Sequence, residues 1–129
     1  MTTLSNVETF ALIPAELATA TITGGDVDLQ GRITNRQLKA IAIGLWTAAG
    51  DSNEVCDITI EESDTTVASD FAAISGAAFT QWIDDDTPYL EEIHFRTDKR
   101  YIRAVATMAG TTPSFTVGVV CQAEMRYTP

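Results

Sequence analysis

The sequence predicts an all-β fold: a single antiparallel β-sandwich, jelly-roll-like, with one short helix and an extended N-terminal arm. Its 129 residues suit one domain, and a hydrophobic fraction of 45% can supply a core. Apolar and polar residues alternate with a period of two in several runs, as they do along half-buried strands. Turn-forming pairs such as Gly24-Gly25 and Asp98-Lys99 separate these runs. Short alternating strands between turns are typical of sandwiches and jelly rolls.

Along the chain, residues 1–16 show no clean period, and we predict that they form an arm that orders on a partner. Residues 17–129 form the sandwich domain. The strands expected within it are the alternating runs 18–23, 27–31, 38–47, 54–62, 89–96, 100–108 and 114–126.

Three of these runs place apolar residues on one face most clearly. The face in 114–126 contains Phe115, Val117, Val119, Cys121, Ala123 and Met125, the face in 54–62 contains Cys56, Ile58 and Ile60, and the face in 38–47 contains Ile41, Ile43 and Leu45. Side chains of a pleated strand point alternately to its two sides, so each set shares one side of a sheet.

The last three runs are predicted to form an antiparallel meander over 89–126, with a hairpin at "AGTTP", residues 109–113. One stretch departs from the period of two. Val67, Phe71 and Ile74 in "TTVASDFAAISGAAF" are four and three residues apart, which predicts one or two helical turns.

The composition argues against several functions. A net charge of −10 disfavours nonspecific binding to nucleic acid, and no run is long and apolar enough to span a membrane. No basic, apolar leader is visible, so we expect synthesis in the cytoplasm. Cys56 and Cys121 are interpreted as buried thiols, with a disulfide as the alternative, and two cysteines with one histidine cannot complete a zinc site.

Catalytic residues are not evident, and we predict no enzyme activity, cofactor or metal. The single histidine, His94, has no nucleophile or orienting acid at a recognisable spacing. The acidic runs at 84–86 and 91–92 are interpreted as solvated, with calcium binding or a glycosidase carboxylate pair as alternatives.

Positive charge gathers in one place, at Arg96, Lys99, Arg100 and Arg103. Arg103 shares a face with Tyr101, where a buried guanidinium needs a carboxylate. We predict a structural ion pair with Glu61, Glu62, Asp64 or Glu91, with a protein interface as the alternative for these arginines.

Two tryptophans are candidates for surface contacts. Trp46 ends its strand at a rim, in contact with loops or with another subunit. Trp46 and Trp82 also leave open a carbohydrate-binding role, since exposed aromatics stack on sugars.

Three ordered stretches, "GGDVDLQGR" (24–32), "ITIEESDTTVASDFAAI" (58–74) and "KRYIRAVATMAGTTPSFTVGVV" (99–120), together resemble small virion structural proteins of tailed bacteriophages. The likeness spans roughly residues 20–126. "SDT" at 63–65 stands where that family has a double aspartate, which weakens the expectation of a carboxylate site there.

The resemblance implies a non-enzymatic capsid decoration (cement) protein that binds the outer surface of the head and stabilises it. Its implied partners are the major capsid protein and further copies of itself, commonly in a trimer, and its implied place is the capsid surface of the virion. The expected interface residues are Phe10, Leu12, Ile13, Trp46, Arg100 and Arg103. The alternatives are a tail or head–tail connector component and, in another class, a carbohydrate-binding jelly-roll module.

Overall fold

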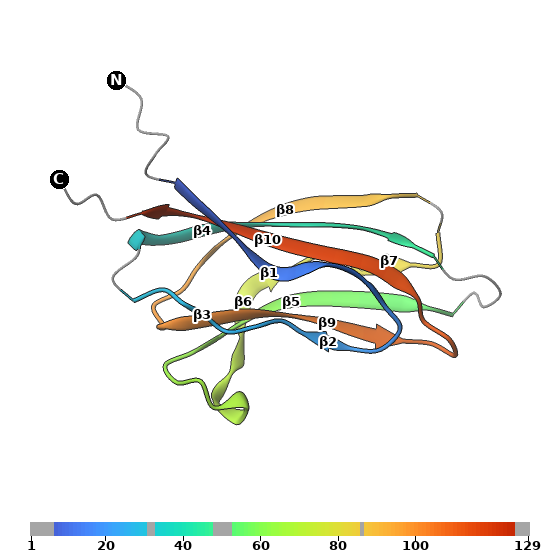
Figure 1. Ribbon diagram of the computed structural model, residues 1–129, viewed down its shortest axis with the longest axis horizontal. Coiled ribbons are helices and arrows are strands. Elements are labelled where there is room, and N and C mark those ends of the chain that lie inside the picture. The colour runs from blue at the N-terminus through green and yellow to red at the C-terminus, as the bar shows by residue number, and fades with distance from the viewer. Residues whose placement is uncertain (1–6, 31–32, 48–52, 86, 126–129) are drawn as a thin grey trace, which may run out of the picture.

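The computed structural model describes residues 7–30, 33–47, 53–85 and 87–125, which form two antiparallel sheets packed face to face (Figure 1). The β4 sheet contains, in this order, β1 (Val7–Ala18), β10 (Phe115–Met125), β4 (Ile33–Trp46) and β8 (Tyr89–Arg96). The β5 sheet contains β2 (Ile22–Thr23), β9 (Tyr101–Ala109), β5 (Val55–Ser63) and β6 (Ala72–Ala78). In it β3 (Val27–Asp28) also pairs with β9, and β7 (Trp82–Ile83) with β5. The predicted all-β sandwich is confirmed.

The pairing order makes this sandwich a jelly roll. β1 pairs with β10, β2 and β3 with β9, β4 with β8, and β5 with β6, and every pair is antiparallel. These pairs are nested, so that the chain resembles one long hairpin rolled into two sheets. Double-sheet jelly rolls have this arrangement, which leaves few open edges.

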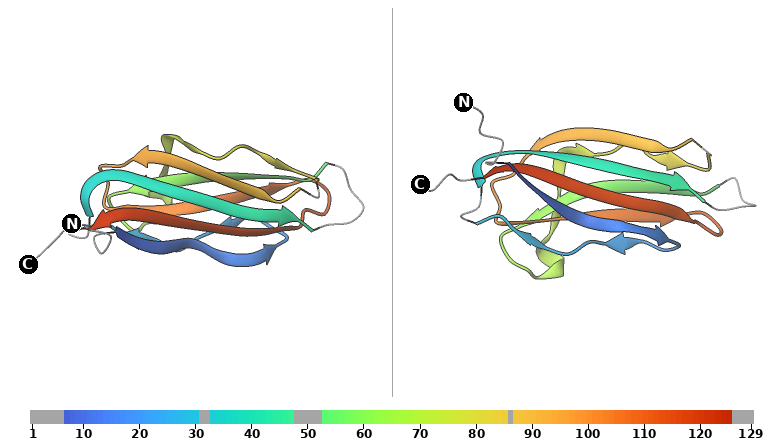
Figure 2. Two further views of the ribbon diagram at one scale, coloured as in Figure 1. Left: turned by 90° about the horizontal axis from the view of Figure 1, so that it is seen from above. Right: turned by 45° about the horizontal axis from the view of Figure 1, so that its top comes forward.

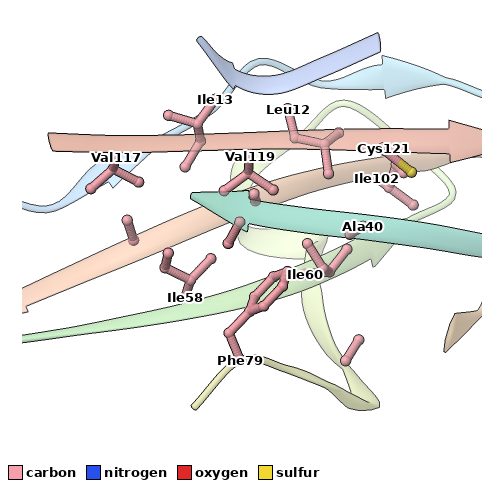
Figure 3. Packing of buried hydrophobic residues seen from close by; sticks show 14 of the residues in the cluster. Leu12, Ile13, Ala40, Ile58, Ile60, Phe79, Ile102, Val117, Val119 and Cys121 are labelled. Carbon is pink, nitrogen blue, oxygen red and sulfur yellow. The ribbon is translucent and has the colours of Figure 1, made fainter. Parts of the chain in front are cut away.

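The core lies between the sheets, where inward-pointing side chains of both interdigitate (Figure 3). From the β4 sheet it receives Val117, Val119 and Cys121, and from the β5 sheet Ile58, Ile60 and Ile102, each at most 1% exposed. The alternation that predicts these inward faces of β5 and β10 is confirmed. Each such side chain contributes roughly 1.5–3 kcal/mol when it leaves water.

Both cysteines are free and buried in this core. Desolvation raises the pKa of the Cys56 and Cys121 thiols from 9.0 to about 12. Because the thiol pKa is higher in the folded state than in the unfolded state, the thiols stabilise the fold fully below about pH 9, and this contribution is lost as the pH rises toward 12.

Because both thiols are buried and protonated, we expect a thiol reagent to leave the native protein unmodified at about pH 8 and to label both cysteines in denaturant. Rapid native labelling would contradict this burial.

The N-terminal segment differs from the expected arm. Its described part belongs to β1, which pairs along its length with β10, and Leu12 and Ile13 are only 1% exposed. The register shifts between Ala11 and Ile13 and again between Ile13 and Glu16. Such bulges interrupt the alternation of side chains, which explains why no clean period is visible in the sequence. Residues 1–6 lie outside the described residues.

The predicted helical stretch is mostly extended. Only η2 (Ala68–Asp70), a short 3-10 helix, is helical, and β6 follows it directly. Ile74 is buried but Val67 is exposed, so the spacing of four and three is not that of one helical face. None of the helices among the described residues is long and apolar enough to cross a membrane.

The predicted meander over 89–126 is wrong, although its three strands exist. β8 and β10 lie in the β4 sheet, whereas β9 lies in the β5 sheet between β2 and β5. The segments after β8 and after β9 therefore cross from one sheet to the other, and "AGTTP" is part of such a crossing instead of a hairpin turn. Alternation and turn residues locate strands, but the partner of a strand depends on contacts far along the chain.

Candidate functional site

No other described segment covers the outer side of the β4 sheet (Figure 2, left). The residues on this side are apolar over much of its area. Neighbouring strands bring these side chains into adjacent rows through the pairs Ala11–Val120, Gly118–Ile43 and Ile43–Leu90. We call this surface the apolar face. It consists of Ala11, Ala15, Leu17, Ile41, Ile43, Leu45, Leu90, Thr116, Gly118 and Val120.

Strand β4 contributes its larger apolar side chains to this outer surface. Ile43 is 54% exposed, whereas Ala40 and Ala42 are fully buried on the other side of the strand. Both sides of β4 are apolar, so alternation predicts that Ile41, Ile43 and Leu45 share a side without saying which side is inside. Leu90 on β8 is 72% exposed beside Ile43.

Polar side chains border the apolar face at one end. Gln122, Lys39 and His94 lie in one row across β10, β4 and β8. Glu92 lies 2.8 Å from His94 Nε2 and 3.9 Å from Lys39 Nζ. His94 is thus an exposed strand residue beside a carboxylate.

The outer side of the β5 sheet holds the predicted arginine ion pair. Arg103 and Glu61 are directly opposite in the register of β9 and β5, and Arg103 Nε donates to Glu61 Oε1 at 2.8 Å. The guanidinium lies 4.1 Å from the centre of the Phe71 ring. The two charged side chains are 15% and 22% exposed. Glu61 is one of the four partners that the sequence predicts.

The rest of the basic cluster also pairs within the chain. Arg100 donates from Nε and Nη2 to the two carboxylate oxygens of Asp28, at 3.0 and 2.9 Å, and this raises the pKa of Arg100. Lys99 Nζ donates to Asp64 at 3.1 Å, which raises the pKa of Lys99. Arg96 lies 3.3 Å from Asp98. Each basic residue of the cluster is therefore paired with a carboxylate of the same chain.

Replacing Arg103 tests how much its ion pair with Glu61 contributes to stability. Arg103→Met leaves Glu61 half-buried without its partner, and we expect the free energy of unfolding to fall by about 2 kcal/mol. The matched control is Arg100→Met, because the exposed Arg100–Asp28 pair is screened by solvent and should shift the urea midpoint little. Urea unfolding of the three proteins measures this, and equal losses in the two variants would contradict the assignment.

A pocket of about 400 Å³ lies where β5, η2 and the β8–β9 connection meet, lined by Glu62, Ser63, Asp64, Thr65, Asp70, Ala72 and Lys99. Its polar groups bond to one another: Thr65 Oγ1 donates to Asp70 at 2.7 Å, and Lys99 pairs with Asp64. Within the described residues no group of three or more His, Cys, Asp or Glu side chains could hold a metal ion. The single histidine does not line this pocket, so Ser63 has no histidine beside it.

The tryptophans do not form a sugar-stacking platform. Trp82 is 1% exposed and stacks on Tyr89, with ring centres 5.0 Å apart and planes 8° from parallel. Trp46 is half-buried and packs against the core, and its Nε1 has no hydrogen-bond partner among the described residues. Packing is therefore the role of Trp82.

The six expected interface residues lie in different environments. Leu12 and Ile13 are core residues, so they are not available for contact with a partner, because β1 turns them inward at its bulge. Phe10 and Trp46 are partly buried against the core. Arg100 is exposed and Arg103 is mostly enclosed, and each is paired as described above.

One buried charged residue is absent from the sequence predictions. Glu54 is fully buried, and neither of its carboxylate oxygens has a hydrogen-bond partner among the described residues. Its position two residues before Cys56 continues the inward face of Cys56, Ile58 and Ile60, so the alternation itself could have placed it inside.

The comparisons with known proteins concern the fold. No family of known proteins and no curated protein matches the sequence. Among solved structures, the chain is similar to the PBSX exported protein XepA (TM-score 0.58, 17% identity, 95% of this chain and 38% of XepA). It is also similar to VP2 of an infectious bursal disease virus subviral particle (TM-score 0.53, 12% identity, 90% of this chain and 31% of VP2). A third similar structure is the SPBc2 prophage-derived protein YomS (TM-score 0.46, 15% identity, 91% of this chain and 93% of YomS). The chain thus spans about two fifths of XepA and a third of VP2, with which it shares a fold.

Proposed function

We propose that the protein is a non-enzymatic structural component of a phage virion, and that it decorates the outer surface of the head, binds the major capsid protein and stabilises the shell. The observation that carries this proposal is the apolar face, an uncharged exposed surface on a chain of net charge −10. Monomeric soluble proteins rarely expose contiguous apolar patches of more than a few hundred Å², so such a face is typical of an assembly subunit.

Three further observations support the proposal. XepA is named as a protein of PBSX, and VP2 forms a viral particle, and both share this sandwich. The three ordered stretches of the sequence resemble phage virion proteins. In the described residues, His94 bonds to Glu92 and does not line the pocket at η2, so this pocket holds no serine–histidine pair, which favours a structural role over catalysis.

The test is the copy number of the protein in purified virions, measured by quantitative mass spectrometry against the major capsid protein. A ratio near one copy per capsid subunit is the expected result for a decoration protein. A ratio lower by an order of magnitude or more would move the protein to the tail or the head–tail connector. A level no higher than that of abundant host proteins in the same preparation would overturn the virion role.

A further inference from the structure

We propose that two copies of the chain pair through their apolar faces, related by a twofold axis that runs parallel to the strands between β10 and β4. This goes beyond the virion role, because it names a second copy as the occupant of the apolar face and leaves the other surfaces of the assembly for the capsid. A contact of the same surface on both partners closes on itself, so it produces a dimer, or a larger assembly built from dimers. The trimer implied by the resemblance would need a different contact.

The shape of the middle row of the apolar face favours this pairing, because the row has small residues at one end and large residues at the other. On β1 and β10 this row contains the exposed Ala15 and the buried Gly118, and an added Cβ at Gly118 would lie 3.2 Å from Ala15 Cβ. On β4 and β8 the same row contains Ile43 and Leu90. The proposed axis places Ile43 and Leu90 of each copy on Gly118 and Ala15 of the other, so that protruding side chains in this row meet small ones.

The charge of the contacting surfaces also favours this pairing. Two copies of a chain with a net charge of −10 repel each other unless the contacting surfaces are neutral. The apolar face has no charged member, and the proposed axis keeps like charges apart at its border. Lys39 of one copy faces Gln122 of the other, because β4 lies over β10 and β8 over β1. Glu92 faces Ala11 and keeps Lys39 and His94 of its own chain beside its carboxylate.

The area of the outer side of the β4 sheet is also large enough for a specific interface. Four strands about 4.8 Å apart, with about eight residues each at about 3.4 Å, give a sheet face of roughly 500 Å² in projection. Two such faces in contact bury roughly 1,000 Å² or more of accessible surface in total, which is the size at which specific interfaces begin. An apolar centre with a polar border is also the usual anatomy of such interfaces.

Other occupants fit the apolar face less well. An anionic membrane surface attracts basic residues, whereas this chain is acidic. A sugar needs exposed aromatic rings and polar groups, and the apolar face contains neither an aromatic residue nor more than one hydroxyl group. A second copy meets the requirements of shape, charge and area together.

Sedimentation velocity of the full chain over a concentration series tests the pairing. We expect a dimer in the unmodified protein, and Leu90→Glu should weaken it at least about 100-fold, because each copy would bury a carboxylate against Ala15. Val67→Glu is the matched control, since Val67 is an equally apolar, 55% exposed residue outside the apolar face, and it should leave the dimer intact. A monomer at all concentrations, a trimer, or a dimer that Leu90→Glu leaves unchanged would overturn the proposal. Circular dichroism verifies that both variants are folded.

A disulfide cross-link tests the orientation. In the double variant Ala15→Cys with Leu90→Cys, the two new thiols of one chain are three strands apart, too far to bond with each other. The proposed axis brings each beside its counterpart in the other copy, so oxidation should give a covalent dimer on a non-reducing gel. Each single variant should remain uncrosslinked. Cross-linking in a single variant, or none in the double variant, would overturn the proposed axis.

Discussion

Replacing Gly24 with alanine is expected to lower the free energy of unfolding by at least about 3 kcal/mol, or to prevent folding altogether. An alanine Cβ at this position would collide with the carbonyl oxygen of Leu12 in β1. The backbone cannot easily move away, because Gly24 N donates to the carbonyl oxygen of Ala104 in β9 at 2.9 Å. Gly24 is therefore a point where β1 of one sheet and β9 of the other approach the same residue.

The adjacent glycine provides the control. Gly25 has nothing within 4 Å of an added Cβ, so Gly25→Ala should change the urea midpoint little. Urea unfolding monitored by tryptophan fluorescence gives both values, and the yield of soluble protein reports a complete failure to fold. Similar losses in the two variants would show that turn flexibility, and not the approach of β1, determines the effect.

Trp82→Ala is expected to cost about 3–5 kcal/mol of unfolding free energy, as for large aromatic side chains in other cores. The Trp82 ring lies between Tyr89 and Phe115, with ring centres 5.0 and 6.4 Å away. It also lies against Gly44, where an added Cβ would collide with the ring. Trp82 thus joins β7 of the β5 sheet to β4, β8 and β10 of the β4 sheet.

Trp82→Phe is the control, because it keeps an aromatic ring against Tyr89 and should lose less than half as much. Thermal and urea unfolding measure both variants. If Trp82→Ala retained the stability of the unmodified protein but abolished binding on a glycan array, Trp82 would be a ligand-binding residue, contrary to its 1% exposure.

The arginine cluster and the glycines show how far sequence reasoning extends to the candidate sites. Arg103 was predicted to need a carboxylate, and Glu61 was among four candidates, because a charge on a half-buried face has few ways to be compensated. The choice among the four followed from the register of β5 and β9. Gly24 and Gly25 are alike in the sequence, and only the approach of Leu12 distinguishes them.

The apolar face was the feature least accessible to prediction. Its residues come from four strands whose order in the sheet, β1-β10-β4-β8, brings together segments from both ends of the chain. Ile41 and Ile43 were recognised as sharing a side, but the pattern is equally apolar on Ala40 and Ala42. In the structure Ala40 and Ala42 are fully buried in the core, and Ile43 is 54% exposed on the outside.

The sequence by itself determined the all-β class, the position of most strands, the inward faces of β5 and β10, and the burial of both cysteines. These properties are local, because the alternation of a pleated strand is written in consecutive residues. The tertiary structure alone decided the sheet to which each strand belongs and the place of β1 at the edge of the β4 sheet. It also decided which side of β4 faces outward and which carboxylate pairs with each arginine. Those properties depend on pairings between residues as far apart as Phe10 and Cys121, which no local period encodes.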